Sequence, residues 1–142
     1  MFKNKYPLFK AGRLLKTEML NELRDYPRNF IDITFKSYCN GIIYGCEIDV
    51  NDEVLIIKRG IIKHNDVIYI LEEDKEVEYK CNNKLMVLKI RFLEQITNKD
   101  FIENTTEIYL DENIEIKEDE IELCRFFLRE GAHLRIHYTG FE

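Results

Sequence analysis

The fold of this chain is decided by Ile56-Ile-Lys-Arg-Gly-Ile-Ile-Lys-His-Asn-Asp-Val-Ile-Tyr-Ile70. β-Branched residues dominate this stretch, and they are enriched in strands because their side chains pack well on a pleated surface. Gly60 separates two isoleucine pairs, which predicts a bulge or a barrel corner. Asn65-Asp66 predicts a turn that leads into a second strand, and His64 beside it is interpreted as a turn residue. The stretch therefore predicts a bent strand followed by a hairpin of buried strands.

Strand patterns continue on both sides of this stretch. Ile42, Tyr44 and Cys46 alternate with their neighbours, which indicates a strand from Gly41 onward. Asn51-Asp52 then predicts a hairpin turn before a strand over 54–58. Further strands are predicted over 77–79, 85–93, 107–110, 114–116 and 121–129. A helix over the last of these ranges stays open as an alternative, because its apolar residues also fit one helical face.

The N-terminal residues predict helices instead. Thr17 is a candidate N-cap for a short helix from about Glu18 to Asp25. Pro27 predicts an interruption and the start of a second helix, which Asn40-Gly41 would end. The fold class is therefore α+β. A short N-terminal helical segment, within an extended and helical docking segment over 1–40, precedes a β-rich body over 41–142, predicted as a mainly antiparallel sandwich or partly open barrel.

The composition excludes several classes of function. With 142 residues, 45% of them hydrophobic, the chain is long enough for one domain with a core. Its net charge of −6 does not favour nucleic acid or anionic lipid as a partner. The sequence has no apolar run of about 18 residues and no signal-peptide pattern. We expect no membrane partner, and synthesis in a bacterial cytoplasm with four free, mostly buried cysteines.

Candidate catalytic and metal-binding residues are few. His133 and His137 are four residues apart with Glu130 nearby, a spacing that suits a transition metal, but no HExxH pattern accompanies them. Surface or interface histidines are the favoured interpretation. Cys46 is a candidate nucleophile, yet a reactive thiol needs a base and an electropositive setting that the sequence does not locate. A small buried core residue is favoured there.

Charged runs and phosphate motifs give no stronger signal. The runs Glu72-Glu73-Asp74 and Glu118-Asp119-Glu120 lack the spacing of a calcium loop, so both are predicted to be solvated. None of the six glycines is followed by lysine, which excludes a P-loop, and a GxGxxG pattern is absent. We therefore predict no enzymatic activity, no cofactor and no metal.

Three segments nevertheless occur in a notable order. They are Phe9-Lys-Ala-Gly-Arg-Leu-Leu-Lys-Thr-Glu-Met-Leu-Asn-Glu-Leu23, then Asn40-Gly-Ile-Ile-Tyr-Gly-Cys-Glu-Ile48, then the stretch 56–70. This set resembles the N-terminal module of baseplate and fibre-attachment proteins from phage tails and related contractile particles. Arg28 matches an arginine before the glycine-containing crossing, whereas Arg59-Gly60 lacks the proline of the family's turn. Residues 120–135 are also similar to a segment of clostridial phage-element proteins, some of which are labelled helicases.

The resemblance implies a structural component of a contractile phage tail or tail-like bacteriocin. Its role would be that of an adaptor between the baseplate and a receptor-binding fibre. The implied partners are baseplate proteins, a tail fibre or receptor-binding protein, and further copies of the chain in a symmetric particle. We expect the N-terminal segment to dock through apolar residues, namely Tyr6, Leu8, Phe9, Leu14 and Leu15.

Two alternatives are carried beside this function. One is a carbohydrate-binding module that contacts the host surface through exposed tyrosines of the β body. The other is a small metal- or thiol-dependent enzyme that uses Cys46 or His133. The tail from Tyr138 to Glu142 is expected to pack on a neighbour.

Overall fold

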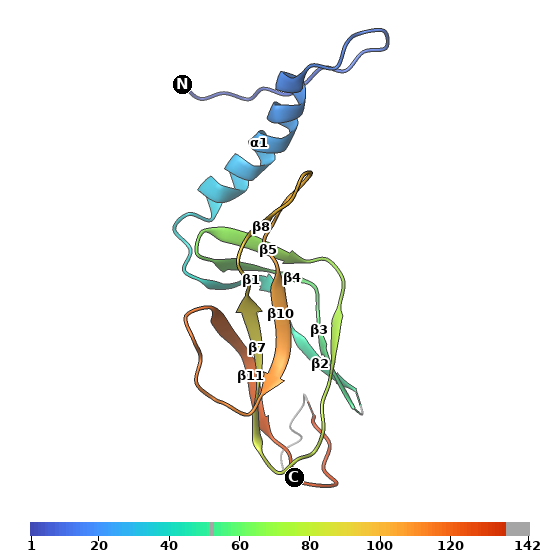
Figure 1. Cartoon of the computed structure of the whole chain (residues 1–142), viewed down its shortest axis with the longest axis vertical. Helices are drawn as coiled ribbons and strands as arrows, with labels where there is room; N and C mark the ends of the chain where they lie inside the picture. Colours follow the sequence, from blue (N-terminus) through green and yellow to red (C-terminus); the bar gives the residue numbers. More distant parts are fainter. Residues whose placement is uncertain (52, 136–142) are drawn as a thin grey trace, which may run out of the picture. The chain divides into compact units, whose positions relative to one another are not determined.

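The computed structural model describes residues 1–51 and 53–135. These residues form one α-helix and eleven strands, which confirms the α+β class (Figure 1). Every strand pair is antiparallel. The described strands form three three-stranded sheets and one two-stranded hairpin, and they do not close into a barrel. The chain divides into two compact units, Met1–Cys39 and Asn40–Glu142.

Helix α1 (Thr17–Thr34) is continuous, so the predicted break into two helices is wrong. Pro27 lies inside it and lacks the N–H that would reach the Leu23 carbonyl, yet the helix continues past it to Thr34. Thr17 is the first helical residue and not the N-cap, which is Lys16. The helix ends at Thr34, well before the predicted stop at Asn40-Gly41. The C-cap Phe35 N–H still donates to the Ile31 carbonyl at 3.0 Å.

Six strands after the helix form two sheets. The first has the order β1-β4-β5, with β1 (Gly41–Gly45), β4 (Gly60–His64) and β5 (Val67–Leu71). The second has the order β2-β3-β6, with β2 (Ile48–Asn51), β3 (Val54–Ile57) and β6 (Lys75–Glu78). Both predicted hairpins, β2–β3 and β4–β5, are confirmed.

The turn between β4 and β5, and the change of sheet between β3 and β4, explain this arrangement. Asn65 and Asp66 both have positive φ, 47° and 65°, as primed two-residue hairpin turns require. Gly60 opens β4 just after the chain has left the sheet of β3, so the chain turns a corner between two sheets here, although these sheets do not form a barrel. The bulge in this sheet lies instead in β1, between Ile42 and Tyr44.

The third sheet has the order β10-β7-β11. Its strands are β7 (Leu85–Phe92), β10 (Thr106–Asp111) and β11 (Glu120–Phe127), so the helical alternative for the last segment is wrong. The predicted strand over 114–116 is also wrong. Asp111 Oδ1 accepts the Asn113 N–H and Asn113 Oδ1 accepts the Glu115 N–H, each at 3.0 Å, and such local bonds compete with strand pairing.

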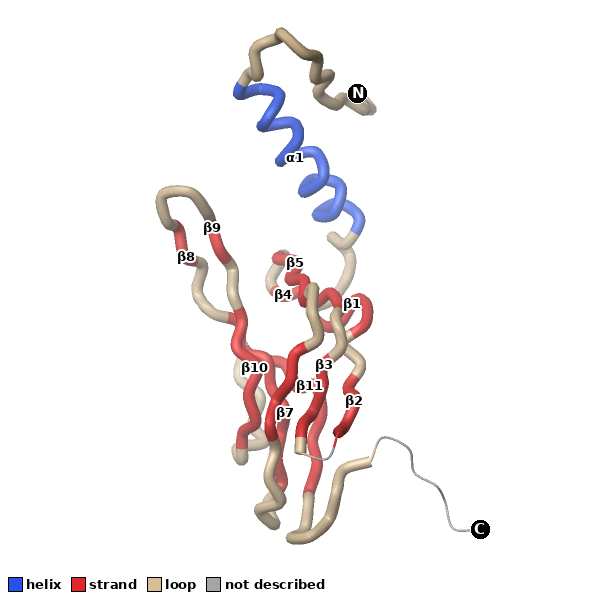
Figure 2. The backbone as a smooth tube through the Cα atoms, turned by 90° about the vertical axis from the view of Figure 1, so that its right-hand side faces the viewer, coloured by secondary structure: helices blue, strands red, loops and turns tan. Residues whose placement is uncertain are grey.

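Two strands were not predicted, β8 (Ile96–Thr97) and β9 (Ile102–Glu103). They pair with each other in a hairpin that extends past the end of β10 (Figure 2). Each has only two residues, so neither can show the alternation by which a strand is recognised.

One hydrophobic core joins the three sheets. Its buried members come from all of them and from the loops between: Cys46, Leu55, Ile57, Ile62, Tyr79, Leu88, Ile90, Phe92 and Leu128. Burial of one such leucine or isoleucine side chain contributes about 1.5–3 kcal/mol. The shared core therefore makes residues 40–135 a single β-rich body.

Candidate functional site

The N-terminal unit presents an apolar surface around a groove of about 580 Å³. All five predicted docking residues line this groove: Tyr6, Leu8, Phe9, Leu14 and Leu15. Each stays between 55% and 88% exposed. The structure therefore gathers residues from both sides of Gly12 into one accessible surface, which we call the docking surface.

A turn and an ion pair shape this surface. Gly12 has φ +79°, a conformation that glycine adopts without steric cost, and the Arg13 N–H donates to the Lys10 carbonyl at 3.2 Å. Lys5 Nζ lies 3.0 Å from Glu18 Oε1 at the start of α1. The hydrogen bond and the charge of Lys5 lower the pKa of Glu18. Such exposed pairs contribute little energy, so this pair stabilises the surface only weakly.

Helix α1 extends the docking surface. All of its residues are described, and none of them is buried. Its exposed apolar side chains are Leu20, Leu23, Tyr26, Phe30 and Ile33. An isolated helix of this length is marginal in water, and most helices in proteins are stabilised by packing of an apolar face. Exposed apolar patches of this kind mark interaction sites, so the geometry suits contact with a partner.

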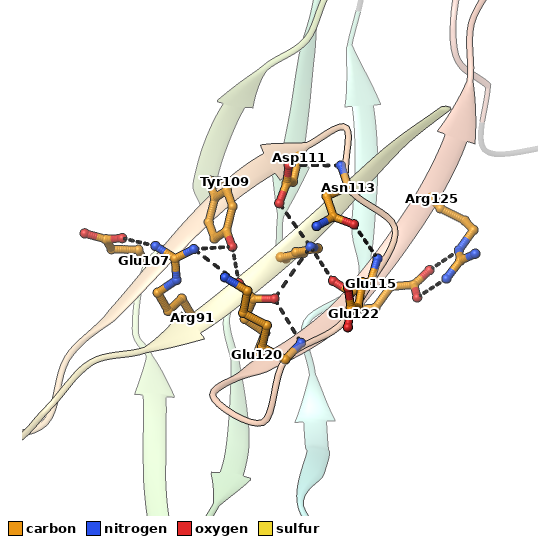
Figure 3. A network of polar contacts seen from close by, with 11 residues as sticks. Arg91, Glu107, Tyr109, Asp111, Asn113, Glu115, Glu120, Glu122 and Arg125 are labelled. Atoms are coloured by element: carbon orange, nitrogen blue, oxygen red, sulfur yellow. Dashed lines mark hydrogen bonds and ion pairs between the residues drawn. The ribbon is translucent and has the colours of Figure 1, made fainter. Parts of the chain in front are cut away.

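A buried polar network crosses the β10-β7-β11 sheet (Figure 3). Lys89 is at its centre with a side chain that is 1% exposed. Its Nζ atom lies 3.0 Å from Asp111 Oδ2, 2.8 Å from the Glu115 carbonyl oxygen and 3.5 Å from Glu120 Oε2. Burial alone would lower the pKa of Lys89, but these two carboxylates outweigh it and raise the pKa.

Glu120 accepts hydrogen bonds on both carboxylate oxygens. The Tyr109 hydroxyl and Arg91 Nη2, the latter at 3.2 Å, donate to Oε1, and the Lys117 N–H donates to Oε2 at 3.2 Å. Burial alone would raise the pKa of Glu120, but these donors and the charge of Lys89 hold it at about 2. A general acid or base works best with a pKa near the operating pH. Glu120 is therefore suited to fixing the sheet rather than to proton transfer, and the prediction that its acidic run is solvated is wrong at this residue.

The other candidate residues are dispersed. Cys46 is buried in the core, as predicted, and burial raises the pKa of its thiol, which disfavours the nucleophilic thiolate. His133 and Glu130 are exposed, and His137 lies outside the described residues. Within the described ranges, no group of three His, Cys, Asp or Glu residues is placed to hold a metal ion. All four cysteines are free.

His64 is not a turn residue, contrary to the prediction. It is the last residue of β4, it is 7% exposed, and its ring stacks on Phe92 with centroids 3.9 Å apart. A turn signal directly after a strand does not tell whether the preceding residue faces the core.

The tyrosines of the body give little support to a glycan platform. Tyr44 is 69% exposed, whereas Tyr79 is buried and Tyr69 and Tyr109 are half-buried. Tyr138 falls outside the described residues, as does the tail expected to pack on a neighbour. In the described part of the chain, no helix has both the length and the apolar character needed to cross a membrane.

Comparison with known proteins adds no family assignment. The chain matches no protein-family model, no curated protein and no solved structure. The resemblance to tail baseplate proteins stays a prediction.

The polar network was not predicted from the sequence. One signal was available, because Lys89 interrupts the apolar run of 85–93 between Leu88 and Ile90. A lysine buried in a central strand needs a carboxylate beside it, because an unpaired buried charge is disfavoured. The sequence does not show that Glu120 is this partner.

Proposed function

We propose that the protein is a non-enzymatic structural adaptor that binds a partner through its docking surface. One observation carries this proposal: the five docking residues, which are separated along the chain by the Gly12 turn, line a single exposed groove beside a helix without buried residues. Aromatic and aliphatic side chains grouped in this way are typical anchors of protein interfaces. The β-rich body, fixed by its shared core and its polar network, would supply a rigid support.

The particle in which this adaptor works is the finer part of the proposal. The order of the three segments supports a contractile phage tail or a tail-like bacteriocin, with the protein at the baseplate where receptor-binding fibres attach. Its partners would be a baseplate protein and a fibre protein. Assembly would follow synthesis in the bacterial cytoplasm.

Particle incorporation tests the proposal directly. In cells that encode the protein, the full chain is replaced by a tagged copy, particles are purified, and the protein is quantified by mass spectrometry. The test variant carries Leu14→Asp and Leu15→Asp, which place charge on the docking surface. The matched control carries Ile70→Asp and Ile114→Asp, at exposed apolar residues of the body.

The expected result is that the original chain and the control are found in particles, whereas the docking variant is reduced at least about tenfold, a loss of about 1.4 kcal/mol in binding. If the original chain were absent from particles, or if the docking variant were incorporated as well as the control, the proposal would be wrong.

A further inference from the structure

The two units carry opposite charge. Residues 1–39 contain eight Lys or Arg and four Asp or Glu, a formal charge of +4. Since the net charge of the whole chain is −6, residues 40–142 carry a charge of −10. The contrast is sharpest in residues 1–17, which we call the arm. The arm has five basic residues and no acidic one: Lys3, Lys5, Lys10, Arg13 and Lys16. Charges arranged in this way attract the two units of different copies to each other.

The body has a groove whose lining complements the arm. Its volume is about 300 Å³. Tyr69, Phe92 and Leu93 give it an apolar wall, and Glu94, Glu118 and Asp119 give it three carboxylates. None of the three carboxylates forms an ion pair with a described residue. We call this the acidic groove.

A second, independent feature also indicates a ligand. His64 lines the acidic groove, and its Nδ1 atom is buried with no hydrogen-bond partner among the described residues. Buried polar atoms are nearly always paired, and one left unpaired costs about 1–3 kcal/mol. A ligand that brings a polar group to Nδ1 would remove this cost. The stacking of His64 on Phe92 holds the ring in place for such a contact.

We propose that the acidic groove binds the arm of a second copy of this chain. Lys10, Arg13 and Lys16 match the three carboxylates, while Leu14 and Leu15 between them match the apolar wall. This inference rests on the proposed function, because it names the partner of the docking surface. It also gives the contact a direction, arm to groove, and head-to-tail contacts of this kind close into rings or continue as chains.

Charge reversal in the full-length chain tests this contact. The arm-reversed variant carries Lys10→Glu, Arg13→Glu and Lys16→Glu, and the groove-reversed variant carries Glu94→Lys, Glu118→Lys and Asp119→Lys. The control carries Glu72→Lys, Glu73→Lys and Glu76→Lys, which changes the net charge of the body equally at exposed residues outside the groove. Self-association is measured by sedimentation equilibrium, and circular dichroism checks that each chain is folded.

We expect the original chain and the control to associate, and the association of the original chain to weaken at high salt. Each reversed variant should associate at least tenfold more weakly. A mixture of the two reversed variants should associate again, because the original arm meets the original groove and the reversed arm meets the reversed groove.

Three results would overturn the inference. The first is an original chain that stays monomeric at every concentration. If arm reversal then changed the hydrodynamic radius of this monomer, the arm would be bound to the body of its own chain. The second is association that neither reversal weakens. The third is a mixture that does not associate. In each case, particle incorporation that depends on Leu14 and Leu15 would still support the adaptor function with a different partner.

Discussion

At the scale of single residues, the body depends on a charge that the sequence presents as part of an acidic run. Glu120 is buried, and both of its carboxylate oxygens accept hydrogen bonds from Tyr109, Arg91 and the Lys117 backbone. Lys89 is buried beside it on the central strand of the sheet. Neither charge could remain buried without the other groups of the network, because an unpaired ion in the interior is strongly disfavoured.

Removing this carboxylate should destabilise the protein markedly. Glu120→Ala leaves Arg91 and the buried Lys89 without their shared partner, and we expect the free energy of unfolding to fall by about 3–5 kcal/mol. Glu107→Ala is the matched control, since Glu107 is exposed and lies 3.9 Å from Arg91, and it should change stability by less than about 1 kcal/mol. Urea unfolding of both variants measures the difference. Equal effects would mean that the network does not stabilise the sheet.

The same carboxylate should make stability depend on pH in the acid range. The pKa of Glu120 is held at about 2 against an ordinary value of 4.5. A lowered pKa contributes stability above pH 4.5, and this contribution is lost as the pH falls toward 2. The original chain should therefore lose stability more steeply between pH 4.5 and pH 2 than Glu120→Gln, which does not titrate. Parallel curves for the two proteins would contradict the burial of an ionised Glu120.

At the scale of elements, glycine positions control how the sheets meet. A Cβ atom on Gly60 would lie 2.5 Å from the Cys46 nitrogen and sulfur and from the Tyr44 carbonyl oxygen. A Cβ atom on Gly45, which has φ +65°, would collide with the Arg59 carbonyl oxygen. The backbones of β1 and of the corner before β4 thus approach each other too closely for any side chain.

Gly60→Ala should test this close approach. We expect it to lower the free energy of unfolding by at least about 2 kcal/mol, because the added methyl group meets backbone atoms that cannot move independently. Gly131→Ala is the control: Gly131 has φ +79° but open space around it, so only its backbone conformation contributes, at about 1 kcal/mol. A Gly60→Ala protein as stable as the control would show that the backbone around Gly60 leaves room for a methyl group.

The elements also show which parts of the fold were predictable. The β4–β5 hairpin was predicted because Asn65-Asp66 gives a local turn signal between two runs of β-branched residues. The single helix was not, because one proline lost one hydrogen bond without ending α1. The segment 114–116 has the residue types of a strand, but Asn113 ties it into a local turn. Local signals were thus sufficient for hairpins, whereas tertiary and side-chain contacts decided the rest.

The candidate site was predictable to a similar degree. The apolar residue types of the arm were visible in the sequence, including Leu14 and Leu15. Their gathering around one groove depends on the turn at Gly12 and on the contact of Lys5 with Glu18, which the sequence does not specify. The acidic groove was not predicted at all, because it combines the end of β4 with residues that lie about 30 and 55 positions further along the chain.

At the scale of the whole molecule, the two units would have different roles in the proposed adaptor. The N-terminal unit exposes apolar and basic side chains, and the body supplies a core, a fixed polar network and an acidic groove. Such a division suits a protein that acts by its position in an assembly, since one unit makes contacts while the other keeps its shape. We propose above all that the docking surface is covered by another protein chain in a tail particle.

A cryo-EM map of the assembled particle tests this claim most directly. We predict density for the protein at the baseplate, with Tyr6, Leu8, Phe9, Leu14 and Leu15 buried against a neighbouring chain. A map that contains the protein but leaves these five side chains facing solvent, or a baseplate that lacks the protein, would contradict it.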